Sequence, residues 1–365
     1  MRRAALLAIA VALTGAARAP EGLPPTAPYL QNGTPGGVTL VWRDADPKPA
    51  TVVLTDDWGH QAAQKRVTAA PQQEVTLSGL TPGEVYRYRV VEQGRVLGSG
   101  RFRNNRPAGA DHMRFAVIGD MGEGRAVQFA LARQLTDWRP EFVLAVGDII
   151  YPEGEGTLYG DRFFGPYDAL MHEAIFYPAL GNHDVLTGNG APYLAAFALP
   201  RSPGNERYYA FDWGPARFWC LDSTQSLAPN SPQYRWFRAD ADASGARWKF
   251  AFFHHPVYSS GFHGSTWSLR HYLEPIFAHD HFAVVFSGHD HDYERTKPQH
   301  GVTYVVTGGG GATVYGMWGP SRFTAAESLR HHFVGVSLYH DTLALQAVDP
   351  QGEVFDAAVL RRPAD

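Results

Sequence analysis

Five short apolar runs in this chain are each followed by side chains that can bind a metal ion. The runs occupy residues 115–118, 142–146, 176–180, 249–253 and 283–287. The side chains that follow them are two aspartates, a tyrosine, an asparagine and three histidines: Asp120, Asp148, Tyr151, Asn182, His254, His289 and His291. Short buried strands often deliver polar side chains from their carboxyl ends to the active site of an α/β fold. The regular recurrence of this arrangement predicts one shared site.

The chemistry of this set indicates two metal ions. Hard cations prefer oxygen donors and borderline cations accept imidazole, so a mixed set suits iron, manganese or zinc. Seven candidate ligands are too many for one ion but suit two ions that share a bridging side chain. Two ions about 3.5–4 Å apart clamp the attacking and leaving oxygens of a phosphoryl displacement.

Each part of the set has an ordinary structural interpretation when taken alone. A Gly-Asp pair at a strand end is most often a turn or a helix cap, and His254-His255 could be a satisfied pair in the core. Asn182-His183 could be a capped loop. His289 and His291 are more specific, because alternate residues of an extended segment face the same side. The joint occurrence of all these parts favours the metal site.

The chain begins with a segment typical of export signals. Arg2 and Arg3 precede the apolar stretch 4–13, and small residues follow, with an Ala-x-Ala site at 17–19. We therefore expect residues 1–19 to be a signal peptide and the protein to be periplasmic or secreted. An uncleaved anchor is the alternative. No later run reaches the length needed to cross a bilayer, so we expect no membrane span.

Residues 20–107 are expected to form a small all-β domain. Val38, Leu40 and Trp42 alternate with more polar neighbours, as in a half-buried strand. A Pro-Gly turn at 82–83 precedes Tyr86, Tyr88 and Val90, which would share one face of the next strand. The Leu-x-Pro-Gly-x-x-Tyr-x-Tyr pattern of this stretch resembles the fibronectin type III sandwich. Residues 104–111 are expected to be the linker.

Residues 112–365 are expected to form a second domain in which strands alternate with helices. Apolar spacing predicts one amphipathic helix over 127–138 and another over 269–277, the latter interrupted by Pro275. A strand over 302–307 leads into a loop of four glycines, 308–311. Residues 333–360 are predicted to be closing antiparallel strands with turns near 341 and 349–350.

The bulk composition excludes several classes of protein. The chain has 365 residues, 44% of them hydrophobic and 19% charged, which is ordinary for a globular protein. Its formal net charge of −4 gives no basic balance that would suggest binding to nucleic acid. Cys220 is the only cysteine, so an intramolecular disulfide cannot form. Its apolar neighbours predict a buried structural thiol.

The order of the motifs resembles the calcineurin-like metallophosphoesterases, and within them the purple acid phosphatases. The motifs are Asp-x-Gly, Gly-Asp-x-x-Tyr, Gly-Asn-His-Asp, His-x-Pro and Gly-His-x-His, in this order over roughly residues 113–310. Tyr151 is the discriminating residue, because it lies three residues after Asp148, where that family has its iron-binding tyrosine. The resemblance implies a metallophosphoesterase β-sandwich core flanked by helices, of α/β class, preceded by the fibronectin type III-like sandwich.

The resemblance also implies a role for each site residue. Asp120, Tyr151 and His291 would hold a ferric ion. Asn182, His254 and His289 would hold a divalent ion, which could be iron, zinc or manganese, and Asp148 would bridge the two. His183 and His263 would be catalytic histidines that bind no metal, although Gly264 stands where many plant members have a second histidine. His255 would be a spacer, and His271, His279 and His281 are expected on the surface.

The implied activity is that of a secreted acid phosphatase, which hydrolyses phosphate monoesters with a metal-bound hydroxide. Three negative ligands, five positive charges on the metals and one hydroxide leave the centre at +1, which attracts a small phosphorylated substrate. A phosphodiesterase or nucleotide hydrolase on the same metal scaffold is the first alternative. A phosphate-binding or adhesion protein without catalysis is the second. The sequence leaves the oligomeric state open.

Overall fold

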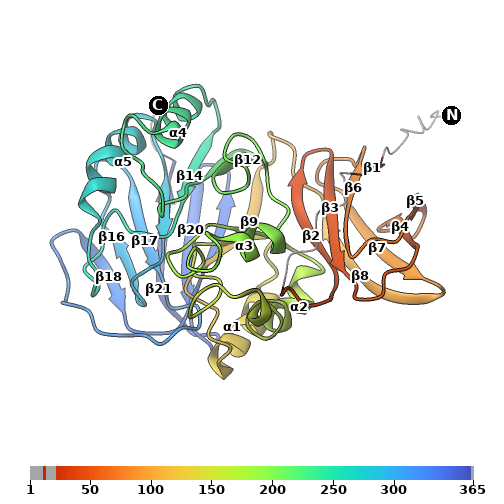
Figure 1. Ribbon diagram of the computed structural model, residues 1–365. Helices are drawn as coiled ribbons and strands as arrows, with labels where there is room; N and C mark the ends of the chain where they lie inside the picture. Colours follow the sequence, from red (N-terminus) through yellow and green to blue (C-terminus); the bar gives the residue numbers. More distant parts are fainter. Residues whose placement is uncertain (1–10, 14–21, 363–365) are drawn as a thin grey trace.

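The computed structural model describes residues 11–13 and 22–362, which form four β-sheets and several helices (Figure 1). The predicted signal peptide lies almost entirely outside the described residues. Only Val11–Leu13 of that segment is described, as strand β1, which pairs antiparallel with β6. Among the described residues, no helix combines the length and hydrophobicity that a membrane span requires.

The first two sheets form the N-terminal all-β domain. One sheet has the order β1-β6-β3-β2, with β2 Thr26–Thr34, β3 Gly37–Arg43 and β6 Gln72–Ser78. The other has the order β5-β4-β7-β8, with β4 Ala50–Asp56, β5 Gln61–Val67, β7 Val85–Glu92 and β8 Arg95–Arg103. The alternation predicted for β7 is confirmed, because Tyr86, Tyr88 and Val90 are buried while Arg87 and Arg89 are exposed.

Strand β3 departs from the predicted alternation, because all seven of its residues are buried. Its last residue, Arg43, and its neighbour strand β2 contact the C-terminal domain. Arg43 Nη2 donates hydrogen bonds to the carbonyl oxygens of Ala195 and Ala196, at 3.1 and 3.2 Å. The Tyr29 hydroxyl donates to Ala196 O at 2.6 Å. A strand buried on both faces loses the period-2 pattern that marks a half-exposed strand.

The linker at 104–111 is tied to both domains. Asn104 and Asn105 are almost fully buried. Asn104 Nδ2 donates to Pro35 O at 2.9 Å, and Asn105 Nδ2 donates to Asp212 O at 2.6 Å. Because these buried amides donate to carbonyl groups on either side, the linker joins the two domains firmly.

The C-terminal domain contains the other two sheets. The first has the order β11-β10-β9-β19-β20-β21, and its strands are β9 His112–Ile118, β10 Phe142–Ala145, β11 Ile175–Pro178, β19 Phe333–Tyr339, β20 Thr342–Val348 and β21 Val354–Arg361. The second has the order β12-β13-β14-β15-β17-β16-β18, and its strands are β12 Tyr209–Trp213, β13 Ala216–Cys220, β14 Trp248–Phe252, β15 Val284–Ser287, β16 Tyr293–Thr296, β17 Thr303–Thr307 and β18 Thr324–Ser328. Strands β9, β10 and β11 are parallel, as are β13, β14, β15 and β17.

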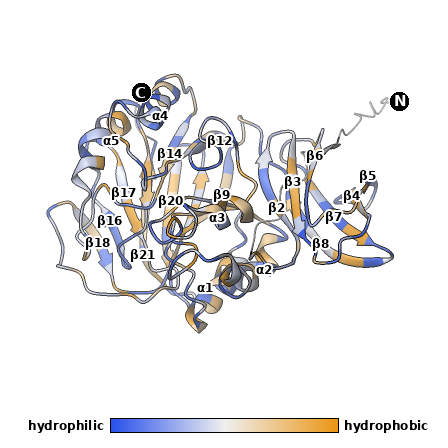
Figure 2. Ribbon diagram, viewed as in Figure 1, coloured by the Kyte–Doolittle hydropathy of each residue, from blue (hydrophilic) through white to orange (hydrophobic). Residues whose placement is uncertain are grey.

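The two sheets pack face to face through aromatic side chains. The Phe115 ring of β9 lies 5.2 Å from Phe142 in its own sheet, and 5.2 and 5.4 Å from Phe218 and Phe250 in the facing sheet. Figure 2 shows hydrophobic residues concentrated in these strands. Cys220 is fully buried here, as predicted, and burial raises the pKa of its thiol. This packing sets the position of one sheet's strand ends relative to the other's.

Helices flank the sheets. The α-helices are α1 Ala126–Trp138, α2 Gly165–Met171, α3 Ala191–Ala196, α4 Pro232–Asp242 and α5 Trp267–His279, with single helical turns at Gly156–Leu158 and Gly160–Phe164. Helices α4 and α5 cover the outer face of the second sheet (Figure 1). The predicted interruption at Pro275 is wrong, because α5 continues through it. Pro275 is exposed, so its ring and the hydrogen bond that it removes face solvent rather than the core.

Candidate metal centre

The structure brings all seven predicted ligands to one edge of the paired sheets. Asp120 follows β9, Asp148 and Tyr151 follow β10, and Asn182 follows β11. His254 follows β14 of the facing sheet, and the other two histidines, His289 and His291, follow β15. Because neighbouring parallel strands end at the same edge, each sheet gathers its own ligands there. The packing of the two sheets then joins both sets.

Tight turns aim the side chains into the site. Asp120, Asp148 and His289 have positive φ angles of 55°, 50° and 74°, so the chain reverses sharply where each strand ends. Gly147 has a φ of 93°, and a Cβ atom there would lie 2.6 Å from His254 Nδ1. Only glycine leaves room for the imidazole to pack across this backbone.

One group of polar atoms surrounds the Tyr151 hydroxyl. This oxygen lies 2.9 Å from Asp120 Oδ1, 3.0 Å from Asp148 Oδ2 and 2.9 Å from His291 Nε2. Four oxygen and nitrogen atoms that could bind a metal therefore converge on one point.

A second group surrounds His254 Nε2. This nitrogen lies 3.0 Å from Asn182 Oδ1, 3.2 Å from His289 Nδ1 and 3.2 Å from Asp148 Oδ2. Asp148 Oδ2 therefore belongs to both groups, and its carboxylate joins them. We call the two sets the Tyr151 group and the His254 group.

Backbone carbonyl groups orient two of the histidines. His254 Nδ1 lies 3.0 Å from Val146 O, and His291 Nδ1 lies 2.7 Å from Thr313 O. A carbonyl oxygen can only accept, so each Nδ1 carries the hydrogen. In the neutral ring each Nε2 then keeps a lone pair directed into the site, as metal-binding histidines require.

The electrostatics of the two groups fit cations. Asp120, Asp148 and Tyr151 are buried, and within the described part of the chain the two aspartates form their ion pairs with histidines. Burial alone would raise the pKa of Asp148, yet His254 and His183 lower it. Burial and the two carboxylates hold the pKa of Tyr151 well above its usual 10. A buried set so rich in acidic oxygen suits metal ions in place of protons.

The pKa values of the two histidines in the His254 group are shifted in opposite directions. Burial disfavours the charged form of His254, but Asp148 and Asp120 raise its pKa to about 10. Burial and the neighbouring histidines lower the pKa of His289 to about 2, which keeps its ring neutral. A neutral imidazole is the form that binds a metal.

The two predicted catalytic histidines lie beside the groups, on different sides. His183 Nε2 is 4.0 Å from Asp148 Oδ2, and its ring is 4.5 Å from the Tyr151 ring. The His263 ring is 4.3 Å from the His289 ring, and its Nε2 is 3.1 Å from the Tyr315 hydroxyl. His183 thus borders the Tyr151 group and His263 borders the His254 group.

The other histidines lie outside the two groups. His255 Nδ1 is 2.9 Å from Ser223 Oγ, and the His255 ring packs 4.5 Å from the ring of His289. His255 therefore helps to hold the predicted ligand His289 in place. His271, His279 and His281 are exposed, as predicted.

Three supporting residues were missed at the level of sequence. Asp184 accepts hydrogen bonds from the backbone of Ile149 and Gly181, both at 2.9 Å, and so ties together the loops after β10 and β11. Asp290 Oδ1 accepts from His263 N at 2.7 Å. The Tyr315 hydroxyl donates to the carbonyl oxygen of residue 289 at 2.9 Å. Asp184 and Asp290 stand inside the motifs, which could have indicated them, whereas no motif marks Tyr315.

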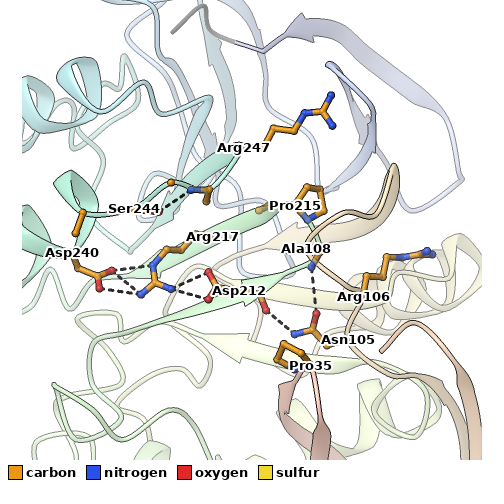
Figure 3. A pocket seen from close by; sticks show the side chains of 15 residues that line it. Pro35, Asn105, Arg106, Ala108, Asp212, Pro215, Arg217, Asp240, Ser244 and Arg247 are labelled. Carbon is orange, nitrogen blue, oxygen red and sulfur yellow. Dashed lines mark hydrogen bonds and ion pairs between the residues drawn. The ribbon is translucent and has the colours of Figure 1, made fainter. Parts of the chain in front are cut away.

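A cavity lies away from these groups, next to the linker (Figure 3). It has a volume of about 630 Å³ and is lined by residues 105–106, 212, 214–217 and 243–247 among others. Arg217 contacts Asp212 at 2.9 Å and Asp240 at 2.9–3.0 Å. Arg106 and Arg247 pair with Glu141 and Asp341. The arginines are already neutralised by carboxylates, so this cavity offers little charge to a ligand.

Comparison with known proteins points to one family. Its sequence profile, described as calcineurin-like phosphoesterase, matches residues 113–293. Purple acid phosphatase 21 of Arabidopsis thaliana is 26% identical over 269 residues, which cover 65% of this chain and 57% of that protein. Tartrate-resistant acid phosphatase type 5 of Homo sapiens is 24% identical, over 54% of this chain and 73% of that protein. The matched part therefore spans little more than half of the Arabidopsis relative.

The solved structures show the same fold. The purple acid phosphatase PPD1 from yellow lupin seeds has a TM-score of 0.79 at 18% identity, covering 93% of this chain and 74% of that chain. A structure of PhoD has a TM-score of 0.72 at 15% identity, over 96% of this chain and 90% of that chain. The predicted fold class is thereby confirmed, including the all-β domain that precedes the α/β domain.

Proposed function

Residues 113–293 are a calcineurin-like phosphoesterase domain, and from this premise we propose that the chain hydrolyses phosphate monoesters at a dinuclear metal centre. The observation that carries the proposal is the shared carboxylate. Asp148 Oδ2 lies 3.0 Å from the Tyr151 hydroxyl and 3.2 Å from His254 Nε2, so one side chain can bridge two cations. The similarity of the chain to purple acid phosphatases also supports this proposed function.

In this proposal the Tyr151 group holds one ion through Asp120, Tyr151 and His291. The His254 group holds the other through Asn182, His254 and His289. When bound, a metal pair supplies Lewis acidity and makes water a better nucleophile. The protein's own part is to fix these metal-binding side chains at the ends of strands.

His183 and His263 are proposed to act on the substrate. Each borders a donor group without belonging to it, so each can reach an oxygen of a phosphate ester held between the groups. A protonated imidazole at that place stabilises negative charge and can give a proton to the leaving oxygen. Tyr315 holds His263 in position, since its hydroxyl donates to the carbonyl oxygen of His289 and is left to accept from His263 Nε2.

The choice of monoester over diester can be tested with a matched pair of substrates. We expect kcat/KM for 4-nitrophenyl phosphate to exceed that for bis(4-nitrophenyl) phosphate, which has the same leaving group. Chelation should abolish both activities and added metal should restore them. A preference for the diester would instead favour the phosphodiesterase alternative, and a protein that binds two ions without turning over either substrate would contradict hydrolysis.

We further propose that the Tyr151 group holds Fe(III). The visible absorption spectrum of the purified protein tests this proposal. Tyrosinate bound to ferric iron should produce a charge-transfer band in the visible spectrum, and Tyr151→Phe should remove it while leaving the fold intact. Tyr315→Phe is the matched control, because that ring lies 4.4 Å from His291 but is no member of the group. A colourless wild-type protein that contains two zinc ions would contradict iron but not hydrolysis.

Export is proposed from the N-terminal segment alone. The predicted signal peptide, residues 1–19, would direct the protein to the periplasm or the exterior. Expression with this segment, followed by fractionation and N-terminal sequencing, tests it: we expect a mature protein outside the cytoplasm that lacks these residues.

A further inference from the structure

Two exposed aromatic side chains stand beside the candidate metal centre. Phe262 is 56% exposed and Trp318 is 77% exposed. Their rings are stacked, with centroids 6.0 Å apart and planes inclined by only 14°. We call this pair the aromatic platform. Exposed apolar surface of this kind, next to a polar site, commonly marks a place where a ligand binds.

The platform is held in position by backbone contacts. Trp318 N donates to Ser260 O at 3.2 Å, and Trp318 Nε1 donates to Phe262 O at 3.1 Å. Both acceptors belong to the segment that carries His263. The tryptophan ring is therefore anchored to the loop of a proposed catalytic residue, although most of its surface faces water.

Ring contacts connect the platform to the metal ligands. Phe262 lies 5.3 Å from the His263 ring, which in turn lies 4.3 Å from His289. Tyr315 gives a second route, with its ring 5.9 Å from Phe262 and 4.4 Å from His291. The aromatic surface thus begins at the two donor groups and ends at the exposed tryptophan.

We propose that the aromatic platform selects phosphate esters whose alcohol portion carries a planar ring. This inference rests on the proposed phosphatase function. If His263 protonates the leaving oxygen, that oxygen lies beside the His263 ring. In this proposal the rest of the alcohol extends from His263 towards Phe262, whose ring lies 5.3 Å away. A planar ring placed there can stack on Phe262 and Trp318, whose faces attract other π systems.

Two kinds of ester share this chemistry, and the platform separates them by length. In an aryl phosphate the ring is attached directly to the ester oxygen, so it should reach Phe262, the ring nearer to His263. In a nucleoside 5′-monophosphate the ribose separates the base from the ester oxygen. The base should therefore reach Trp318, which lies one ring farther out.

The nucleotide arm compares adenosine 5′-monophosphate with ribose 5-phosphate, which have the same leaving alcohol apart from the base. We expect wild-type kcat/KM to favour the nucleotide by about 5- to 100-fold, the range for stacking one base on an aromatic side chain. Trp318→Ala should reduce this ratio to near one. Trp58→Ala is the matched control, because Trp58 is 87% exposed but lies in the turn between β4 and β5 of the N-terminal domain. It should keep the wild-type ratio.

The aryl arm uses phosphonates, which bind without reacting. We expect phenylphosphonate to inhibit more strongly than methylphosphonate, and Phe262→Ala to reduce that difference more than Trp318→Ala does. A third measurement needs no metal: saturation-transfer NMR on the apo protein should show contact with the adenine protons of the nucleotide, lost in Trp318→Ala.

The outcomes test the aromatic platform separately from the proposed phosphatase activity. Equal ratios in wild type, Trp318→Ala and Trp58→Ala, together with equal phosphonate affinities, would overturn the platform even in an active phosphatase. An effect in only one arm keeps the platform and names its ligand, a nucleotide or an aryl ester. A protein that hydrolyses neither ester, but still shows the adenine contact, would keep the platform and contradict the phosphatase proposal.

Discussion

The Asp148→Asn variant is expected to lose about 10³-fold or more in kcat/KM, the range for several kcal/mol of transition-state stabilisation. The reason is geometric, because Asp148 Oδ2 contacts both the Tyr151 hydroxyl and His254 Nε2. The amide keeps the size of the side chain and an oxygen that can accept from His183 N. It removes the negative charge that both ions would share. Metal analysis should show less than two ions per chain, and steady-state kinetics should show the loss.

Two controls make this result interpretable. Circular dichroism and thermal unfolding should show that Asp148→Asn is folded. Asp168→Asn, at an exposed position on α2, makes the same chemical change away from the site and should keep both metals and full turnover. Two tightly bound metals and near-normal turnover in Asp148→Asn would mean that this residue is no bridge.

The second large effect is expected at His183 and His263. Replacing either with alanine should reduce turnover by about 10²–10³-fold, which is typical for loss of a general acid or an electrostatic contact. Both variants should keep their two metals, because neither ring belongs to a donor group. The measurement is kcat for each variant with metal content determined on the same sample.

The leaving group distinguishes the roles of the two histidines. A poor leaving group needs a proton and a good one does not, so the variant that lacks the proton donor should lose more on an alkyl phosphate than on an activated aryl phosphate. We expect this dependence for His263→Ala, with His183 as the alternative donor. His271→Ala, an exposed histidine on α5, is the control and should behave as wild type. Equal losses on every leaving group would exclude both as proton donors, and loss of metal would place the residue among the ligands.

The N-terminal domain has a visible structural role. Its strand β2 packs against the C-terminal domain, where the Tyr177 hydroxyl donates to Gly33 O at 3.0 Å. Tyr177 belongs to β11, the strand that precedes Asn182. The domain therefore supports a strand that carries a predicted ligand, which agrees with a supporting role for this sandwich.

Several structural elements could be predicted from local pattern. The helix over 127–138, the alternating faces of β7 and the closing strands at 333–360 all appear where expected. The errors arose where distant parts of the chain decide the outcome. Strand β3 is buried on both faces and its Arg43 contacts the other domain, and α5 passes through Pro275, which faces solvent. The short stretch of sequence that shows each pattern does not reveal which side of the element will face another domain or solvent.

The sequence by itself determined which residues could form the site. Apolar runs that end in Asp, Tyr, Asn or His specify strands whose carboxyl ends meet, so the seven candidates could be named without coordinates. The family resemblance implied how they are grouped, and the tertiary structure decided how they come together. Asp120, Asp148 and Asn182 follow strands of one sheet, while the three histidines follow strands of the other. The stacking of Phe115 against Phe218 and Phe250 sets the two sheets face to face, and this packing places His254 against Asp148 and Tyr315 beside His263. Contacts of this kind depend on residues far apart in the chain, 52 positions for His263 and Tyr315, which no local spacing contains.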